Sequence, residues 1–344
     1  MVRLSIFFSV VILIISACKQ DRTAEYKTAV SNQNCCNYFE LPDSLSKNAN
    51  VRMITIDGKY KVWTKQFGNG PIKVLLLHGG PAMTHEYMEC FESFFPKAGI
   101  EFFEYDQLGS YYSDQPDDSS LWTTERFVEE VEQVRKALGL DNTNFYLLGN
   151  SWGGILAMEY ALKYQNNLKG LIVSNMTASI PRYEQYNTTL RSQMRKPLLD
   201  SLESFERKGD VNNPAYTSLV ETNYYNEHIC RIVPWPDPVQ RSFKHVNSVI
   251  YVMMQGPSEF KTGGRLLHWD RWNDLKNIHV PTLMIGGKYD TMNPADMEAQ
   301  SKLVQHGRYL YCPNGSHLSM WDDQEHYYPG IIQFLNDVQS GNFK

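Results

Sequence analysis

The stretch that decides the fold is residues 145–154, Phe-Tyr-Leu-Leu-Gly-Asn-Ser-Trp-Gly-Gly. Its first four residues form a short apolar run, which predicts a buried strand. Residues 151–164 have the pattern of a helix, so Ser151 lies at a tight turn from strand to helix. In a G-x-S-x-G pattern, such a turn exposes the serine hydroxyl at the end of the strand, and the glycines make the strained backbone possible. Ser151 is therefore the candidate nucleophile.

Short apolar runs recur on both sides of this stretch and alternate with helical segments. Residues 51–56 and 59–64 flank Asp57-Gly58, which predicts a hairpin. Alternation of strands and helices predicts an α/β fold with a mostly parallel sheet and helices on both faces. Further strands are expected at residues 73–77, 101–105, 170–173, 281–285 and 307–311, and further helices at residues 123–138 and 323–339.

The alternation stops between residues 180 and 270, where the chain becomes more polar and rich in proline. This change predicts a helical cap, inserted before the strand that leads to Asp290 and covering the C-terminal edge of the sheet. The expected organisation is a signal peptide at residues 1–17, a tether at 18–45, one core formed by 46–179 and 271–344, and the cap at 180–270.

Composition limits the classes of function. Hydrophobic residues make up 42% of the 344 residues and charged residues 21%, a globular mixture that excludes a disordered or collagen-like chain. The formal net charge is −5 and no run of Lys and Arg occurs, which argues against nucleic acid as a partner.

The N-terminus predicts export. Arg3 precedes an apolar segment at residues 4–17, which is shorter than the roughly 20 residues of a membrane span and has the shape of a secretory signal. It ends in Ile15-Ser16-Ala17-Cys18, which resembles a bacterial lipobox, in which the cysteine is lipidated. We expect an exported lipoprotein, anchored through Cys18 and facing the periplasm or the cell surface. A plain signal peptide and an uncleaved anchor are the alternatives.

The cysteines do not indicate a metal site. After Cys18, five of the six cysteines remain, so not all of them can pair within the chain. No CxxC motif or Cys/His cluster with metal-ligand spacing occurs, and we expect neither a metal nor a cofactor.

A serine hydroxyl needs a base to take its proton, and in folds with this kind of turn the partners follow in the order serine, acid, histidine. Asp290 and His317 each come just after a predicted strand, at the edge where catalytic groups gather in open α/β sheets. Asp296 is a distant second choice for the acid. The competing histidines lie in the cap, before strands or in the closing helix: His228, His245, His268, His279, His306 and His326.

The oxyanion formed during acyl transfer needs two backbone N–H donors. One is expected from Trp152, directly after the nucleophile. The other is expected from the loop His78-Gly79-Gly80-Pro81, where we favour Gly80 over Gly79. His78 is expected to pack under this loop and to bond to its backbone rather than to transfer a proton.

Several motifs together resemble the proline iminopeptidase family of α/β-hydrolases. They are His78-Gly79-Gly80-Pro81, Tyr105-Asp106-Gln107-x-Gly109 and Gly149-x-Ser151-Trp152-Gly153-Gly154. In the cap, His228-Ile229-Cys230-Arg231, Pro234-Trp235-Pro236, Gly256-Pro257-Ser258-Glu259-Phe260 and Trp269-Asp270 resemble the branch with the tricorn-interacting aminopeptidase. The resemblance spans residues 50–340 and implies an α/β-hydrolase fold.

The same resemblance implies release of an N-terminal residue, preferably proline, from peptides. In that family a cap glutamate binds the free α-amino group, and the matching position here is Glu259. Two positions depart from the family pattern. Ala82 replaces the usual last glycine of the loop after His78, and Thr291 stands where several relatives carry a second amine-binding glutamate.

We therefore expect a serine exopeptidase that acts on small peptides with a free N-terminus and contacts the membrane only through its lipid. One alternative is an ester or amide hydrolase on the same scaffold, because a fold alone does not determine a substrate. The other is a surface lipoprotein that binds peptides without catalysis, against which the Ser151, Asp290 and His317 set argues.

Overall fold

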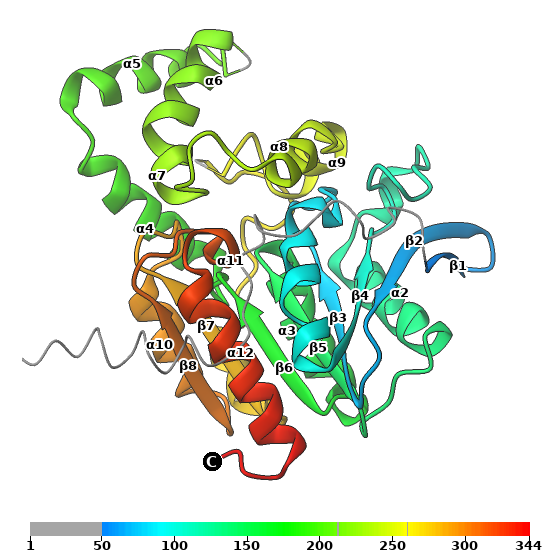
Figure 1. The fold of residues 1–344 in the computed structure, drawn as a ribbon. Helices are drawn as coiled ribbons and strands as arrows, with labels where there is room; N and C mark the ends of the chain where they lie inside the picture. Colours follow the sequence, from blue (N-terminus) through cyan, green and yellow to red (C-terminus); the bar gives the residue numbers. More distant parts are fainter. Residues whose placement is uncertain (1–49, 212, 260) are drawn as a thin grey trace, which may run out of the picture. The chain divides into compact units, whose positions relative to one another are not determined.

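An eight-stranded sheet forms the centre of the structure, a computed structural model that describes residues 50–211, 213–259 and 261–344 (Figure 1). The described residues all belong to one compact unit of the chain, Cys36–Lys344. The predicted signal peptide, Cys18 and the tether lie outside the described residues. No helix within the described part of the chain combines the length and the apolar character that crossing a membrane requires.

The sheet has the order β1-β2-β4-β3-β5-β6-β7-β8. The hairpin predicted around Asp57-Gly58 is confirmed, since β1 (Val51–Ile56) pairs antiparallel with β2 (Tyr60–Phe67), which pairs antiparallel with β4. All other neighbours pair parallel, so the predicted mostly parallel sheet is confirmed as well. These strands are β3 (Ile72–Leu77), β4 (Ile100–Tyr105), β5 (Phe145–Asn150), β6 (Gly170–Ser174), β7 (Thr282–Gly287) and β8 (Gly307–Cys312).

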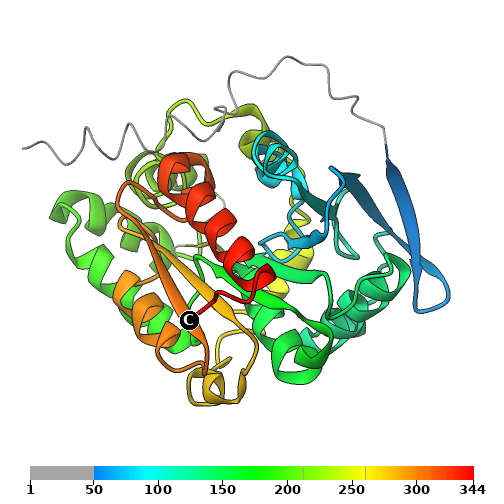
Figure 2. The ribbon, with the colours of Figure 1, turned by 60° about the horizontal axis from the view of Figure 1, so that its bottom comes forward.

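Helices cover both faces of the sheet because alternate strand residues point in opposite directions. On β3, Leu75 and Leu77 belong to the apolar cluster that includes residues of α2, α3 and α10, whereas Val74 and Leu76 belong to the cluster with residues of η2 and α12. Figure 2 shows α12 lying across one face of the sheet. The helices are α2 (Thr124–Ala137), α3 (Trp152–Tyr164), α10 (Pro294–Ser301), α12 (Gln324–Gln339) and the 3-10 helix η2 (His85–Ser93).

The segment between β6 and β7 is helical, and we call its residues 180–270 the cap. Its two ends meet in an isolated antiparallel bridge between Ser179 and Asp270. Part of the cap has a small apolar core of its own, which includes Leu190, Leu202 and Tyr216. The helices gather at one end of the sheet (Figure 1): α4 (Ile180–Ser192), α5 (Lys196–Arg207), α6 (Pro214–Val220), the π-helix η6 (Glu221–Tyr225), α7 (Asn226–His228), α8 (Asp237–Lys244) and α9 (Ser248–Met254).

Candidate active site

Ser151 occupies the turn between β5 and α3, with φ 57° and ψ −128°, outside the regions that side chains usually adopt. Close backbone packing requires both neighbouring glycines. A Cβ atom on Gly149 would lie 1.9 Å from the carbonyl oxygen of Gly153, and one on Gly153 would lie 2.1 Å from that of Leu77. The motif therefore works sterically: glycines let the backbone fold tightly enough to present the Ser151 side chain.

Ser151 lines a small cavity between the core and the cap. Residues that follow strands of the core meet residues of the cap there. The cavity is lined by His317 and Gly80, which the sequence predicts as site residues, and by the cap residue Glu259. The remaining lining residues are Gly79, Met83, Tyr87, Asn150, Ile229, Phe243 and Leu318.

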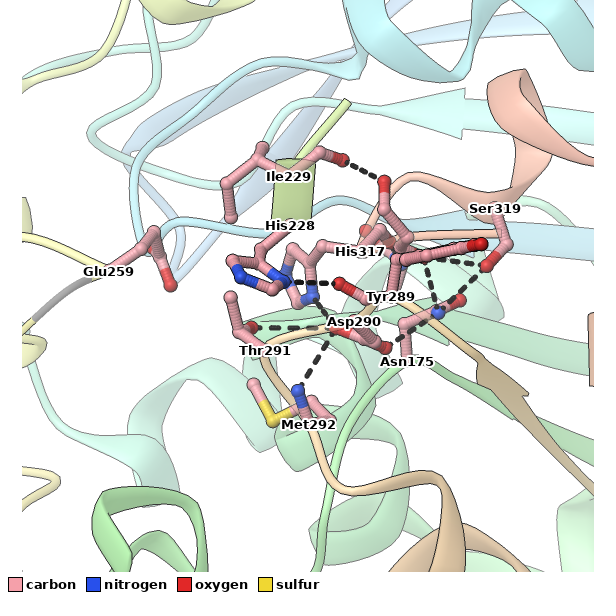
Figure 3. A network of polar contacts seen from close by, with 12 residues as sticks. Asn175, His228, Ile229, Glu259, Tyr289, Asp290, Thr291, Met292, His317 and Ser319 are labelled. Atoms are coloured by element: carbon pink, nitrogen blue, oxygen red, sulfur yellow. Dashed lines mark hydrogen bonds and ion pairs between the residues drawn. The ribbon is translucent and has the colours of Figure 1, made fainter. Parts of the chain in front are cut away.

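Asp290 holds the histidine that lines this cavity (Figure 3). Its Oδ1 atom lies 2.9 Å from Nδ1 of His317 and accepts a hydrogen bond from the backbone N–H of Met292 at 3.1 Å. Its Oδ2 atom accepts one from the side-chain amide of Asn175 at 2.7 Å. Both carboxylate oxygens are thus occupied, and the imidazole is fixed with its other nitrogen, Nε2, available for proton transfer.

The environment of His317 favours its protonated form. Burial by itself lowers the pKa of His317, but the charge of Asp290 and its hydrogen bond, with the charge of Glu259 added, raise that pKa above its ordinary value of 6.5. The backbone of His317 is also held, because its N–H donates to the carbonyl oxygen of the cap residue His228 at 2.9 Å.

Glu259 is a buried carboxylate, only 8% exposed, and tyrosines from two cap helices hold it. The hydroxyl of Tyr251, on α9, donates to its Oε1 atom at 2.5 Å. The hydroxyl of Tyr183, on α4, donates to its backbone oxygen at 2.5 Å and lies 3.5 Å from Oε2. Burial raises the pKa of Glu259, while the charge of His317 and the tyrosine hydroxyls lower it part of the way back. A cation bound in the cavity would compensate for this burial.

Two backbone N–H groups are free to bind an oxyanion beside Ser151. Trp152 is the first residue of α3, where N–H groups have no partner within the helix. In the loop after β3, the N–H of Gly79 donates to the hydroxyl of Tyr87 at 2.7 Å. Among the described residues, nothing accepts from the N–H of Gly80 or of Trp152. This arrangement supports Gly80, rather than Gly79, as the second donor.

The alternative acid and bases have other partners or lie outside the lining of this cavity. His228 contacts the backbone of His317, and its ring Nδ1 atom lies 2.7 Å from the carbonyl oxygen of Tyr289. Asp296 forms an ion pair with Arg182 at 3.3 Å. His245 bonds to Glu86 and His326 to Asp323. None of the competing histidines lines the cavity with Ser151. His78 behaves as expected, since its Nδ1 atom lies 2.8 Å from the carbonyl oxygen of Gly79, in the loop above it.

Three supporting residues were not predicted from the sequence: Asn175, Tyr183 and Tyr251. Asn175 directly follows β6, and a polar residue at the C-terminal end of a parallel strand was the signal that could have found it. The two tyrosines carry no local signal. Tyr183 lies 76 residues from its partner Glu259, and Tyr251, eight residues from Glu259, belongs to a cap helix whose packing no sequence pattern shows.

The structure also describes the two positions that depart from the family pattern. Ala82 has φ 58°, in the left-handed region that favours glycine, so this chain retains a backbone shape that its alanine makes costly. Thr291 is buried, and its hydroxyl lies 3.4 Å from Oδ1 of Asp290. Thr291 therefore contacts the carboxylate of Asp290, whereas a glutamate at this position would add a second charge.

No metal-binding group of three or more His, Cys, Asp or Glu side chains occurs within residues 50–211, 213–259 and 261–344. Cys90, Cys230 and Cys312 are free thiols and are buried.

A serine, a histidine and an aspartate on loops at the C-terminal ends of a mostly parallel sheet, beneath a helical cap, define an α/β-hydrolase. The chain matches the family model described as alpha/beta hydrolase fold over residues 73–324.

Closer relatives narrow this class. The chain is 65% identical to the proline iminopeptidase of Flavobacterium johnsoniae, over 82% of this chain and 95% of the relative. It is 63% identical to that of Elizabethkingia meningoseptica, over 85% of this chain and 99% of the relative. The crystal structure of proline iminopeptidase from Mycobacterium smegmatis superposes with a TM-score of 0.78 at 27% identity, over 85% of this chain and 99% of that one. The chain belongs to the proline iminopeptidase family of α/β-hydrolases.

Proposed function

We propose that this protein is a serine aminopeptidase that releases an N-terminal residue, preferentially proline, from peptides through an acyl-enzyme. The observation that carries the proposal is the single cavity in which Ser151, His317 and the buried carboxylate of Glu259 meet. The relatives at 63–65% identity, both named proline iminopeptidase, support the preference for proline.

The chemistry follows from the positions of these groups. Ser151 Oγ attacks the carbonyl carbon of the first residue, and its proton passes to Nε2 of His317. Asp290 keeps the other ring nitrogen protonated and stabilises the imidazolium. The N–H groups of Gly80 and Trp152 stabilise the oxyanion. When the C–N bond breaks, His317 gives the proton to the departing amine, and a water molecule then releases the N-terminal residue by the same steps.

Glu259 restricts cleavage to the N-terminal residue of the peptide. A free N-terminus is a cation, and a buried carboxylate binds it with a charge-assisted hydrogen bond. An internal peptide bond has no such charge and would leave Glu259 buried without a cationic partner. Because Thr291 stands where several relatives carry a second acid, Glu259 carries most of this task alone.

A panel of aminoacyl-naphthylamides tests the proposal and separates it from a general ester or amide hydrolase. We expect the prolyl substrate to be hydrolysed fastest, the alanyl substrate more slowly and N-blocked proline hardly at all. Equal rates on free and blocked proline would reject an aminopeptidase. A protein that only binds peptides would hydrolyse none of them and would resist labelling of Ser151 by an active-site phosphonate.

We further propose that the protein is an exported lipoprotein, anchored through Cys18. The sequence Ile15-Ser16-Ala17-Cys18 after an apolar segment supports this localisation. Cys18→Ser should prevent lipid attachment and release the protein from the membrane fraction. Equal retention of both proteins in the membrane would indicate an uncleaved anchor instead.

A further inference from the structure

A buried chain of hydrogen bonds runs beneath the cavity and joins three of its loops. Tyr87, on η2, is 1% exposed and lines the cavity. Its hydroxyl accepts the N–H of Gly79 at 2.7 Å and donates to Oδ1 of Asn150 at 2.9 Å. A phenol has one proton and can accept as well, so it makes both bonds at once. Tyr87 thereby connects the loop after β3 to the residue that precedes Ser151.

Asn150 extends the chain to the catalytic histidine. Its Nδ2 atom donates to the carbonyl oxygens of Ser174, at 3.3 Å, and of His317, at 3.4 Å. Both partners can only accept, which orients the amide with its oxygen toward Tyr87. Burial raises the pKa of Tyr87, so its hydroxyl keeps the proton that this bond requires. The donor and the acceptor of each hydrogen bond in this series are therefore determined.

The packing around Tyr87 leaves little room for movement. A Cβ atom on Gly79 would lie 3.2 Å from the Tyr87 hydroxyl and 3.0 Å from Cβ of Ser151. The backbone oxygen of Tyr87 accepts a hydrogen bond from the indole N–H of Trp321, on the short helix α11 (Ser319–Asp322), at 2.7 Å. The segment that follows His317 therefore also holds the backbone of Tyr87, while the Tyr87 hydroxyl accepts a hydrogen bond from the N–H of Gly79.

We propose that Tyr87 is a positioning residue that, through Asn150, sets the N–H of Gly80 relative to Ser151 and His317. The inference rests on the proposed function only in taking Ser151 as the nucleophile. An oxyanion forms with amide and ester substrates alike, so loss of the Tyr87 hydroxyl should slow both. It should affect kcat rather than KM, because the aligned donor contributes most in the transition state.

The first test is Tyr87→Phe, with Tyr146→Phe as the matched control. Tyr146 is a buried tyrosine on β5 whose hydroxyl bonds to Gln339, away from the cavity. We expect kcat of Tyr87→Phe to fall about 10- to 100-fold on prolyl naphthylamide and on an ester without an amine, the range that a small misplacement of reacting groups produces. Affinity for a prolyl trifluoromethyl ketone, which forms a stable oxyanion, should fall by the same factor, with KM unchanged. A kcat equal to that of the control, or a loss confined to KM, would overturn the proposal.

Asn150→Ala provides the second test and completes a double-mutant cycle. Because both residues act through one chain of bonds, the double variant should be no slower than the slower single variant. If Asn150→Ala keeps full kcat while Tyr87→Phe loses it, Tyr87 acts on the substrate directly and the positioning role is wrong. Ester hydrolysis would report on these hydrogen bonds even if prolyl substrates are not cleaved. Failure of the proposed function could therefore be distinguished from failure of the positioning role of Tyr87.

Discussion

The sheet core and the cap build the same cavity by different means. In the core, backbone sterics position Ser151, since side chains on Gly149 or Gly153 would collide with main-chain oxygens. In the cap, Glu259 follows α9 in a loop, and its position depends on hydroxyl groups from Tyr183 and Tyr251. The contrast indicates a division of tasks. We propose that the core performs the chemistry on any acyl group and that the cap selects substrates that carry an amine.

The two buried carboxylates show the same division. Asp290 accepts hydrogen bonds at both oxygens from neutral donors and His317. Glu259 has tyrosine hydroxyls as its hydrogen-bond donors and no Lys or Arg among the residues lining its cavity. Asp290 thus has its hydrogen-bond partners within the protein, whereas a cation on the substrate would give Glu259 a charged partner.

The largest expected effect comes from the core. Ser151→Ala removes the covalent step and should lower kcat about 10⁶-fold, as in other serine enzymes, on amide and ester substrates alike. Thermal unfolding should be unchanged, because the alanine side chain fits where the serine stood. Activity that survives on either substrate in purified variant protein would show that Ser151 is not the nucleophile.

Asp290→Asn tests the carboxylate that holds His317. Loss of the carboxylate should lower kcat about 10⁴-fold, because the asparagine no longer enforces the productive tautomer. It should also move the pH profile. The base must be neutral, so activity falls as pH drops through the pKa of His317, which Asp290 holds above 6.5. Without this charge, burial dominates and the acidic limb should move to lower pH; a limb that stays in place would show that Asp290 does not set this pKa.

The cap should give a smaller effect that depends on the substrate. Glu259→Gln keeps the volume but removes the charge, and a charge-assisted hydrogen bond contributes about 1.5–3 kcal/mol. We therefore expect kcat/KM for prolyl naphthylamide to fall roughly 10- to 150-fold, at 1.4 kcal/mol per tenfold change. Hydrolysis of an amine-free ester should hardly change. Glu227→Gln, an exposed cap glutamate, is the control, and equal losses on both substrates would mean that Glu259 only supports the cap.

A buried glutamate outside the cavity shows what burial of a carboxyl does to stability where no substrate binds. Glu104, on β4, is fully buried, and neither of its carboxylate oxygens has a hydrogen-bond partner among the described residues. Burial, followed by the charges of Glu92 and Glu89, raises its pKa. The folded protein therefore holds this proton more tightly than the unfolded chain. The contribution of Glu104 to stability should fall as pH rises above about 4.5, by about 1.4 kcal/mol per pH unit, until the folded pKa is passed.

Glu104→Gln should remove this contribution to the pH dependence of unfolding free energy while leaving kcat intact. Glu298→Gln, at an exposed position on α10, should leave the slope unchanged. Denaturant unfolding at several pH values measures both. An unaltered slope in Glu104→Gln would show that the carboxyl of Glu104 does not bind its proton more tightly in the folded state.

The sequence predicted the parts of this molecule that depend on local patterns. Apolar runs located the strands to within a few residues, and the glycines around Ser151 predicted the turn that the structure contains. The supporting side chains could not be predicted in this way. Tyr87 meets Asn150, and Asn175 meets Asp290, only because parallel strands bring distant loops to one edge of the sheet. The packing of the cap helices likewise depends on contacts that no local period encodes.

Binding to protein that cannot react tests the division between core and cap most directly. Calorimetry would compare a prolyl dipeptide amide and its N-acetylated form on Ser151→Ala and on Ser151→Ala/Glu259→Gln. We predict that Ser151→Ala binds the free peptide, and that adding Glu259→Gln weakens this binding roughly 10- to 150-fold without changing the weak binding of the acetylated peptide. Equal affinity of the two proteins for the free peptide would contradict the account, because the cap would then not recognise the amine through Glu259.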